Sequence, residues 1–243
     1  MRALRALLSH RIAAGQLSDS ERIASAYQNL EARAGSRWDR ANPGNRAILA
    51  ERRRWTRRLL DRAGLLPLAG KRVLEVGSGT GAELAWLREL GAANQELVGV
   101  DILPDRVAAA RRAYPGIRFD HANAENLGFS DESFDLVLAL TVFSSIPSDA
   151  MARRVAAEIA RVLSPKGALL WYDVRYDSAS NPNVKAVPAA RICELFPSLN
   201  AELHSVTLLP PLARRLGPLT GAYAALAAMP PLRSHLIGLL RKR

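Results

Sequence analysis

The sequence predicts an α/β fold built on a doubly wound, mostly parallel sheet, and three observations support this prediction. Residues 73–76 form a short apolar run typical of a buried parallel strand, and glycines follow at positions 77, 79 and 81. Residues 82–90 contain helix formers, with apolar side chains at helical spacing. Strand-like and helix-like stretches then alternate to about residue 174, as repeated strand–helix units require.

The segment before the first strand is predicted to be helical. We expect helices over residues 1–16, about 18–34 and about 46–63, with a turn at residues 42–45, where the sequence reads Asn-Pro-Gly-Asn. We assign residues 1–70 to an N-terminal helical cap and residues 71–243 to the core domain.

The glycine turn is the first feature that points to a ligand. Ligands of such sheets bind at the carboxyl ends of the strands, beside the first crossover. The spacing here is GxGxG, whereas dinucleotide sites use GxGxxG. Glu75 stands just before the turn, where a carboxylate would repel a pyrophosphate but suit a ligand with a cationic amine.

A second apolar run, residues 97–100, also ends in an acidic residue, Asp101. A carboxylate at the end of the second strand can accept hydrogen bonds from both hydroxyls of a ribose. Further strands are predicted at residues 117–119, 134–140 and 168–173, with helices over about 105–114 and 148–162.

In these features the chain resembles the class I S-adenosylmethionine-dependent methyltransferases. Their first motif is an apolar strand followed by (Glu/Asp)-x-Gly-x-Gly-x-Gly, and residues 73–81 match it position by position. Residues 123–135 match a second pattern, Asp-Ala-Glu-x-Leu-Pro-Phe-x-Asp-x-Ser-Phe-Asp, except for Asn123 and Gly128. Residues 163–167 resemble the Leu-x-Pro-x-Gly turn before the fifth strand. The resemblance spans about residues 71–174 and implies S-adenosylmethionine as cofactor and a Rossmann-like sheet of seven strands.

The resemblance also implies which residues bind the cofactor. Glu75 would help to fix the methionine ammonium, Asp101 would bind the ribose and Ile102 would pack on the adenine. Asn123, with the backbone of Ala124, would bind the adenine, because an amide oxygen can replace the usual carboxylate as acceptor. The full set of predicted cofactor residues is Glu75, Gly77, Ser78, Gly79, Gly81, Asp101, Ile102, Asn123, Ala124 and Leu140.

The acceptor site is predicted at the ends of strands four and five and on the preceding helices. Asp173 is the candidate catalytic base, and Arg175 could hold an anionic group by bidentate bonds. A surface salt bridge or a loop hydrogen bond is the alternative role for each. The predicted substrate residues are Arg175, Tyr172, Tyr176, Tyr27 and Trp38. For Tyr27 and Trp38, plain packing of helix on core is the alternative.

The carboxyl-terminal part completes the predicted sheet. We expect a helix over residues 189–196, a strand over 201–209 and a final antiparallel edge strand over 236–240. A helical insertion at about residues 210–234 separates the last two strands. It is mostly apolar with arginines at its edges. It could therefore cap the substrate pocket, contact a second subunit as in a homodimer, or rest on an anionic membrane.

The composition restricts the class of protein. Of 243 residues, 49% are hydrophobic and 23% charged, as in one ordinary globular domain with elaborations. A single cysteine, Cys193, fits a reducing cytoplasm, and the four histidines are not at metal-ligand spacing, so we expect no metal. No run reaches the roughly 18 apolar residues of a membrane span. We expect a cytoplasmic protein with a peripheral contact at the inner membrane face.

The net charge of +11 fits an anionic partner such as a nucleic acid, an anionic lipid or an acidic substrate. Residues 1–62 hold 14 arginines against six acidic residues, so +8 of the +11 lies there. Only four of the 34 basic residues are lysines, so the arginine- and alanine-rich composition of a GC-rich genome explains the charge equally well.

The function predicted is methyl transfer from S-adenosylmethionine to a small-molecule or glycan-type acceptor, most simply O-methylation. A weaker resemblance to methyltransferases of bacterial polysaccharide and natural-product pathways suggests a sugar or glycolipid-like acceptor. Three alternatives stay open: an RNA methyltransferase, an NAD-linked oxidoreductase, and a cofactor-binding regulatory or membrane-surface protein without catalysis. The Asn/Asp-Pro-Pro-Tyr/Phe motif of many nucleic-acid N-methyltransferases is absent after the fourth strand, which disfavours the first of these.

Overall fold

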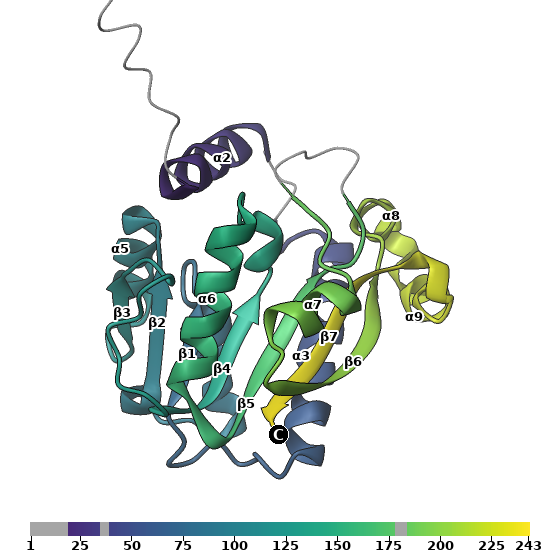
Figure 1. The fold of residues 1–243 in the computed structure, drawn as a ribbon. Helices are drawn as coiled ribbons and strands as arrows, with labels where there is room; N and C mark the ends of the chain where they lie inside the picture. Colours follow the sequence, from purple (N-terminus) through teal and green to yellow (C-terminus); the bar gives the residue numbers. More distant parts are fainter. Residues whose placement is uncertain (1–18, 35–38, 178–183) are drawn as a thin grey trace, which may run out of the picture.

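The protein folds around one seven-stranded sheet that carries helices on both faces (Figure 1). A computed structural model describes residues 19–34, 39–177 and 184–243. The strand order is β3-β2-β1-β4-β5-β7-β6, and β7 runs antiparallel to both of its neighbours. The strands are β1 (Val73–Val76), β2 (Leu97–Asp101), β3 (Arg118–His121), β4 (Phe134–Leu140), β5 (Leu163–Val174), β6 (Leu199–Leu208) and β7 (Arg233–Lys242). This confirms the predicted doubly wound fold of seven strands.

Strand β1 lies at the centre of the parallel part and pairs with β2 on one side and β4 on the other. The chain first winds outward through β2 and β3, then returns to the opposite side of β1 to form β4 and β5. The carboxyl ends of β1, β2 and β4 therefore meet at the switch point of the sheet, where ligands bind in open α/β folds.

The last strand does not lie where the sequence predicted. Strand β7 is inserted between β5 and β6, so β6 forms the edge and the prediction of an edge strand was wrong. The reason is burial: seven consecutive residues of β7, 234–240, are buried, whereas β6 is partly exposed along much of its length. A strand that is buried on both faces reads as a largely apolar run, which does not by itself show where the strand lies in the sheet.

Helix α3 (Pro43–Arg62) begins earlier than the sequence suggested. The predicted turn at residues 42–45 is its first turn, because the side chain of Asn42 caps the helix by accepting from the backbone N–H groups of Gly44 and Asn45. Pro43 occupies the first helical position, where a missing N–H costs nothing. The helix packs against β6, β7 and the insertion helix α8.

The remaining helices cover the two faces of the sheet, and some of them lie beyond the carboxyl ends of its parallel strands. Figure 1 shows α2 and α8 above this edge, with α2 over the β2 and β4 side. The α-helices are α2 (Asp19–Ala34), α4 (Ala82–Trp86), α5 (Pro104–Ala113), α6 (Asp149–Val162), α7 (Ala189–Leu195), α8 (Pro210–Arg215) and α9 (Tyr223–Ala227). Short 3₁₀ helices are η1 (Leu87–Leu90), η2 (Asn94–Glu96), η3 (Phe143–Ser145), η4 (Gly217–Ala222) and η5 (Pro230–Leu232). The helix predicted over residues 1–16 lies outside the described residues.

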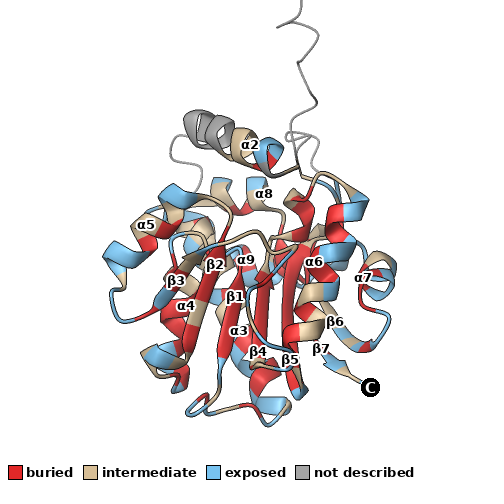
Figure 2. Cartoon of the chain, turned by 60° about the vertical axis from the view of Figure 1, so that its left-hand side comes forward, coloured by how far each residue is buried: buried red, intermediate tan, exposed pale blue. Residues whose placement is uncertain are grey.

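The core has two layers, one on each face of the sheet (Figure 2). One layer packs α6 and α7 on residues such as Leu74, Val76 and Trp171. The other packs α3, α4 and α5 on Val73, Leu138 and others. No helix within the described ranges is long and apolar enough to cross a membrane.

Candidate functional site

The glycine turn after β1 is held tightly against its neighbours. The backbone N–H groups of Gly77 and Ser78 both donate to the carbonyl of Val100 in β2, at 2.8 and 3.0 Å. Gly77, Gly79 and Gly81 all have positive φ, which side-chain-bearing residues rarely adopt. A Cβ on Gly77 would lie 2.8 Å from the side chain of Val142, so the absence of a side chain lets the turn approach the end of β4.

Asp101 connects this turn to the end of β2. Its Oδ2 accepts from the backbone N–H of Gly79 at 2.7 Å, and its Oδ1 accepts from that of Leu103 at 2.9 Å. The side chain is 7% exposed and borders a cavity. Each carboxylate oxygen has two acceptor positions, so both oxygens keep capacity for a ligand hydroxyl.

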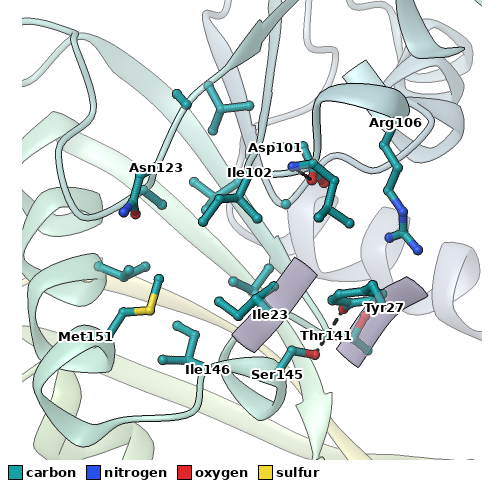
Figure 3. Close-up of a pocket in the computed structure, with 18 of the residues that line it drawn as sticks. Ile23, Tyr27, Asp101, Ile102, Arg106, Asn123, Thr141, Ser145, Ile146 and Met151 are labelled. Carbon is teal, nitrogen blue, oxygen red and sulfur yellow. Dashed lines mark hydrogen bonds between the residues drawn. The ribbon is translucent and has the colours of Figure 1, made fainter. Parts of the chain in front are cut away.

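The cavity lies at the switch point and has a volume of about 130 Å³ (Figure 3). Of the predicted cofactor residues, Gly77, Asp101, Ile102, Asn123, Ala124 and Leu140 line it, as does the predicted substrate residue Tyr27. Most of the other lining side chains are apolar and come from α2, β1, β2, the end of β4 and α6. The structure thus brings the second, third and fourth strand ends together around one space that is lined by both apolar and polar side chains.

Asn123 sits at one end of this cavity. Its side-chain oxygen accepts from the backbone N–H of Glu125 at 3.0 Å, and its amide nitrogen donates to the Glu125 carboxylate at 2.9 Å. This local turn fixes the orientation of the amide at the border of the cavity.

Helix α2 closes the cavity from above. Ile23 and Tyr27 line it, and the Tyr27 hydroxyl is hydrogen-bonded to the Ser145 hydroxyl at 3.0 Å. The Arg106 guanidinium stacks over the Tyr27 ring, 4.4 Å from its centroid. Burial raises the pKa of Tyr27. The sequence analysis expected the end of the fourth strand and the preceding helices to border the acceptor site, but it did not name Ile23, Arg106, Thr141 or Ser145 as site residues.

The end of β4 is bent into an unusual backbone conformation. Thr141, which lines the cavity, has φ +58°. Its N–H donates to the carbonyl of Tyr172 at 2.6 Å and its hydroxyl to that of Leu140 at 2.6 Å. Positive φ in a residue with a branched side chain is uncommon and persists only where surrounding contacts impose it.

Glu75 is buried beneath the turn and does not line the cavity. Its Oε2 has no hydrogen-bond partner among the described residues. Burial first, and then the nearby carboxylate of Glu83, raise the pKa of Glu75 well above its usual range, against the opposing effect of Arg52. Although burial opposes it, Arg52 at 3.0 Å and Arg53 at 3.1 Å hold the pKa of Glu83 below its usual range.

Asp173, the predicted catalytic base, does not line the cavity either. Its carboxylate accepts from the backbone N–H groups of Ser144, at 3.0 Å, and Val174, at 2.8 Å, and also bonds the backbone of Phe143. Burial raises its pKa to about 6. The carboxylate therefore fixes the chain after β4, and its role as the catalytic base stays a prediction.

The other predicted substrate residues are also placed away from the cavity. Tyr172 is buried on the α3 face of the sheet, where its hydroxyl bonds Thr207 at 3.0 Å and its ring stacks on His235. Arg175 stacks on the ring of its neighbour Tyr176 at 4.5 Å and bonds its hydroxyl. Tyr172 is therefore a core residue. Arg175 and Tyr176 interact with each other at the surface, through the hydrogen bond and the stacking contact. Trp38 lies outside the described residues.

Of the predicted cofactor residues, Ser78, Gly79 and Gly81 also lie outside the lining of the cavity. Ser78 is buried, and Gly81 begins α4. These three residues form part of the turn after β1 without facing the cavity. No group of three or more His, Cys, Asp or Glu side chains within the described ranges is arranged to hold a metal ion.

Comparison with known proteins shows which proteins this part of the chain is similar to. A family model described as "Methyltransferase domain" matches residues 74–171. A phthiotriol/phenolphthiotriol dimycocerosates methyltransferase of Mycobacterium tuberculosis is 34% identical over 140 residues, which are 56% of this chain and 50% of that protein. A demethylmenaquinone methyltransferase of Thermus thermophilus is 37% identical over 121 residues, 48% of this chain and 52% of that protein. The chain thus spans about half the length of these curated relatives.

Solved structures share the fold. A 1,6-didemethyltoxoflavin-N1-methyltransferase of Burkholderia thailandensis, solved with S-adenosylhomocysteine, superposes with a TM-score of 0.59 at 17% identity, covering 92% of this chain and 86% of that one. An S-adenosylmethionine dependent methyltransferase of Mesorhizobium loti gives a TM-score of 0.55 at 19% identity, covering 74% and 95%. These likenesses concern the fold alone.

Proposed function

We propose that this protein transfers the methyl group of S-adenosylmethionine to an oxygen of a small, largely apolar acceptor, because residues 74–171 match a family model described as "Methyltransferase domain". One observation carries the proposal. The glycine turn is locked to β2 through Asp101, and both border a cavity at the switch point that helix α2 covers.

The residues present fit the cofactor. The Asp101 oxygens, each with a remaining acceptor position, would bind the ribose hydroxyls. Asn123 and the backbone of Ala124 would bind the adenine, with Ile102 packed on its face. The unpartnered oxygen of Glu75 beneath the turn is an acceptor suited to a cationic ammonium, reached directly or through a water.

The bound cofactor supplies a methyl group already activated by its sulfonium, so the protein has mainly to align the acceptor and exclude water. Ile23 and Tyr27 of α2 close the cavity from solvent. The hydrogen bond between the Tyr27 and Ser145 hydroxyls uses the proton of only one of them. The proton of the other hydroxyl can then be donated to an acceptor oxygen and orient it. The raised pKa of Tyr27 keeps its hydroxyl protonated at neutral pH.

The acceptor is proposed to be of lipid or glycolipid type. The relatives quoted above are named for phthiotriol dimycocerosates and for demethylmenaquinone, which are both largely apolar molecules. These names support such a molecule over a bare polysaccharide. We therefore narrow the glycan-type acceptor expected from the sequence to a glycolipid, and we place the reaction in the cytoplasm at the inner membrane face.

The test is transfer of a labelled methyl group from S-adenosylmethionine to three acceptor preparations: hydroxylated lipids, polysaccharide and RNA. We expect label in the lipid fraction, and less of it with Tyr27→Phe. Label only in RNA or polysaccharide would overturn the acceptor class. Cofactor binding without transfer to any fraction would favour a regulatory protein over an enzyme.

A further inference from the structure

The insertion between β6 and β7 presents a surface that the proposed function does not use. Twelve residues between 209 and 232 are exposed, and eleven of them are apolar or glycine. Leu219 is 70% exposed and Met229 44%, among the most exposed large apolar side chains in the described part of the chain. We call these residues the insertion face: Pro211, Pro218, Leu219, Gly221, Ala222, Ala224, Ala225, Ala228, Met229, Pro230 and Pro231.

The charged residues of the insertion segment itself all have one sign. The twelfth exposed residue is Arg215, and Arg214 and Arg233 border the same segment. Residues 203–243 contain no aspartate or glutamate and six arginines and lysines. An apolar surface with arginines at its rim and no carboxylates complements the apolar interior and anionic headgroups of a lipid bilayer.

The insertion face is a rigid part of the fold. The Tyr223 hydroxyl, on the inner side of α9, donates to the Glu51 carboxylate of α3 at 2.7 Å. Arg233 ties the start of β7 to the end of α9 by donating to the carbonyls of Ala227, at 2.7 Å, and Ala228, at 2.9 Å. The backbone of Ala213 packs closely on Gly44 of α3. A Cβ added to Gly44 would lie only 2.1 Å from the carbonyl oxygen of Ala213. Since the segment is already ordered, docking would cost little conformational entropy.

The position of the insertion face relates it to the candidate site. Helix α8 follows β6 at the carboxyl edge of the parallel strands, the edge that α2 also covers (Figure 1). The Asn42 side chain at the start of α3 donates to the backbone carbonyl of Arg214 at 3.4 Å, which fixes α8 beside the cap of that helix. The insertion face thus begins at this edge with α8 and continues along α9, which lies beside β6 (Figure 1).

We propose that the insertion face docks on an anionic lipid bilayer. A second copy of the chain fits it less well, because two surfaces rimmed by arginine would repel each other, each on a molecule of net charge +11. Delivery of an apolar acceptor from the bilayer to the cavity rests on the proposed function, whereas the docking itself does not.

The experiment is co-sedimentation of the full chain with vesicles of phosphatidylcholine alone or mixed equally with phosphatidylglycerol. We expect binding to the anionic vesicles, loss of most of it in 1 M salt, where the screening length falls to about 3 Å, and little binding to phosphatidylcholine. The double variant L219E/M229E should bind roughly tenfold or more weakly. Its matched control A69E/C193E carries the same added charge at exposed positions outside the insertion face and should bind within about threefold of the natural chain.

Two results would overturn the proposal: no sedimentation with anionic vesicles at low salt, or equal losses in the two double variants. A dimer in analytical ultracentrifugation that only L219E/M229E dissociates would instead assign the face to a second copy. Thermal melting establishes that each variant is folded. Binding of S-adenosylhomocysteine by each variant is measured separately, so that failure of docking and failure of the proposed function give different patterns.

Discussion

At the scale of single residues, Asp101 carries the cofactor assignment, because it holds the glycine turn and borders the cavity at once. Asp101→Ala should weaken binding of S-adenosylhomocysteine by roughly 2–3 kcal/mol, the scale of lost charge-assisted hydrogen bonds. Asp101→Asn keeps one acceptor oxygen and should lose less. Isothermal titration calorimetry checks both, and an unchanged dissociation constant in the alanine variant would refute the assignment.

Gly81 illustrates how the turn depends on missing side chains. Its φ is +80°, and an added Cβ would lie 2.5 Å from the ring of Phe119. Gly81→Ala should therefore lower the free energy of unfolding by about 2–4 kcal/mol. Gly128 has open space around it and no positive φ, so Gly128→Ala should change the same quantity by less than about 1 kcal/mol. Equal effects in urea unfolding would contradict this account of the turn.

Asp173 should make stability depend on pH. Burial raises its pKa to about 6 from an ordinary 3.8, so the folded chain binds this proton more tightly than the unfolded chain. The contribution is fully present below about pH 4 and is lost as the pH rises through about 6, for a total of about 3 kcal/mol.

Asp173→Asn removes this titration. Measured by urea unfolding at about pH 4 and pH 7, the natural chain should lose about 3 kcal/mol more than the variant over that range. A difference of zero or of opposite sign would mean that the hydrogen bonds, which lower the pKa of Asp173, offset or outweigh the effect of its burial.

At the scale of the elements, Glu51 joins three of them through one oxygen. Its Oε2, on α3, accepts from the Tyr223 hydroxyl of α9 at 2.7 Å and from the backbone N–H of Thr207 in β6 at 3.0 Å. Glu51→Ala leaves both buried donors unpaired and should cost about 2–4 kcal/mol of unfolding free energy. Glu51→Gln keeps an acceptor oxygen and should cost clearly less. Indistinguishable urea midpoints for the alanine variant and the natural chain would rule out this link.

The elements show where sequence reasoning succeeds and where it fails. Strands β1, β2 and β4 were predicted well because most of their residues are buried and apolar, and because β1 ends at the glycine turn and β2 at an acidic residue. The start of α3 was missed because an asparagine cap followed by proline also reads as a turn. The place of β7 depends on pairing with β5 and β6, and no local pattern encodes which strand lies at an edge.

At the scale of the whole molecule, the site also contains some residues that sequence motifs predict and others whose place depends on the folded structure. Asp101 and Asn123 follow strand ends in recognisable motifs, and both line the cavity. Tyr172 and Asp173 also follow from a strand end, but the pleat and register of β5 direct one into the α3 face and the other to backbone N–H groups. The lid of Ile23 and Tyr27 comes from long-range packing of α2, which a motif cannot reveal.

The central claim, that this fold binds S-adenosylmethionine at the Gly77–Gly81 turn, is tested most directly by thermal unfolding with S-adenosylmethionine, S-adenosylhomocysteine and NAD in parallel. A ligand at 100 times its dissociation constant adds about 2.7 kcal/mol of stability, which for a domain of this size raises the melting temperature by roughly 5–10 °C. We expect that shift with the first two ligands, its loss in Asp101→Ala, and none with NAD. A shift with NAD alone would contradict the account.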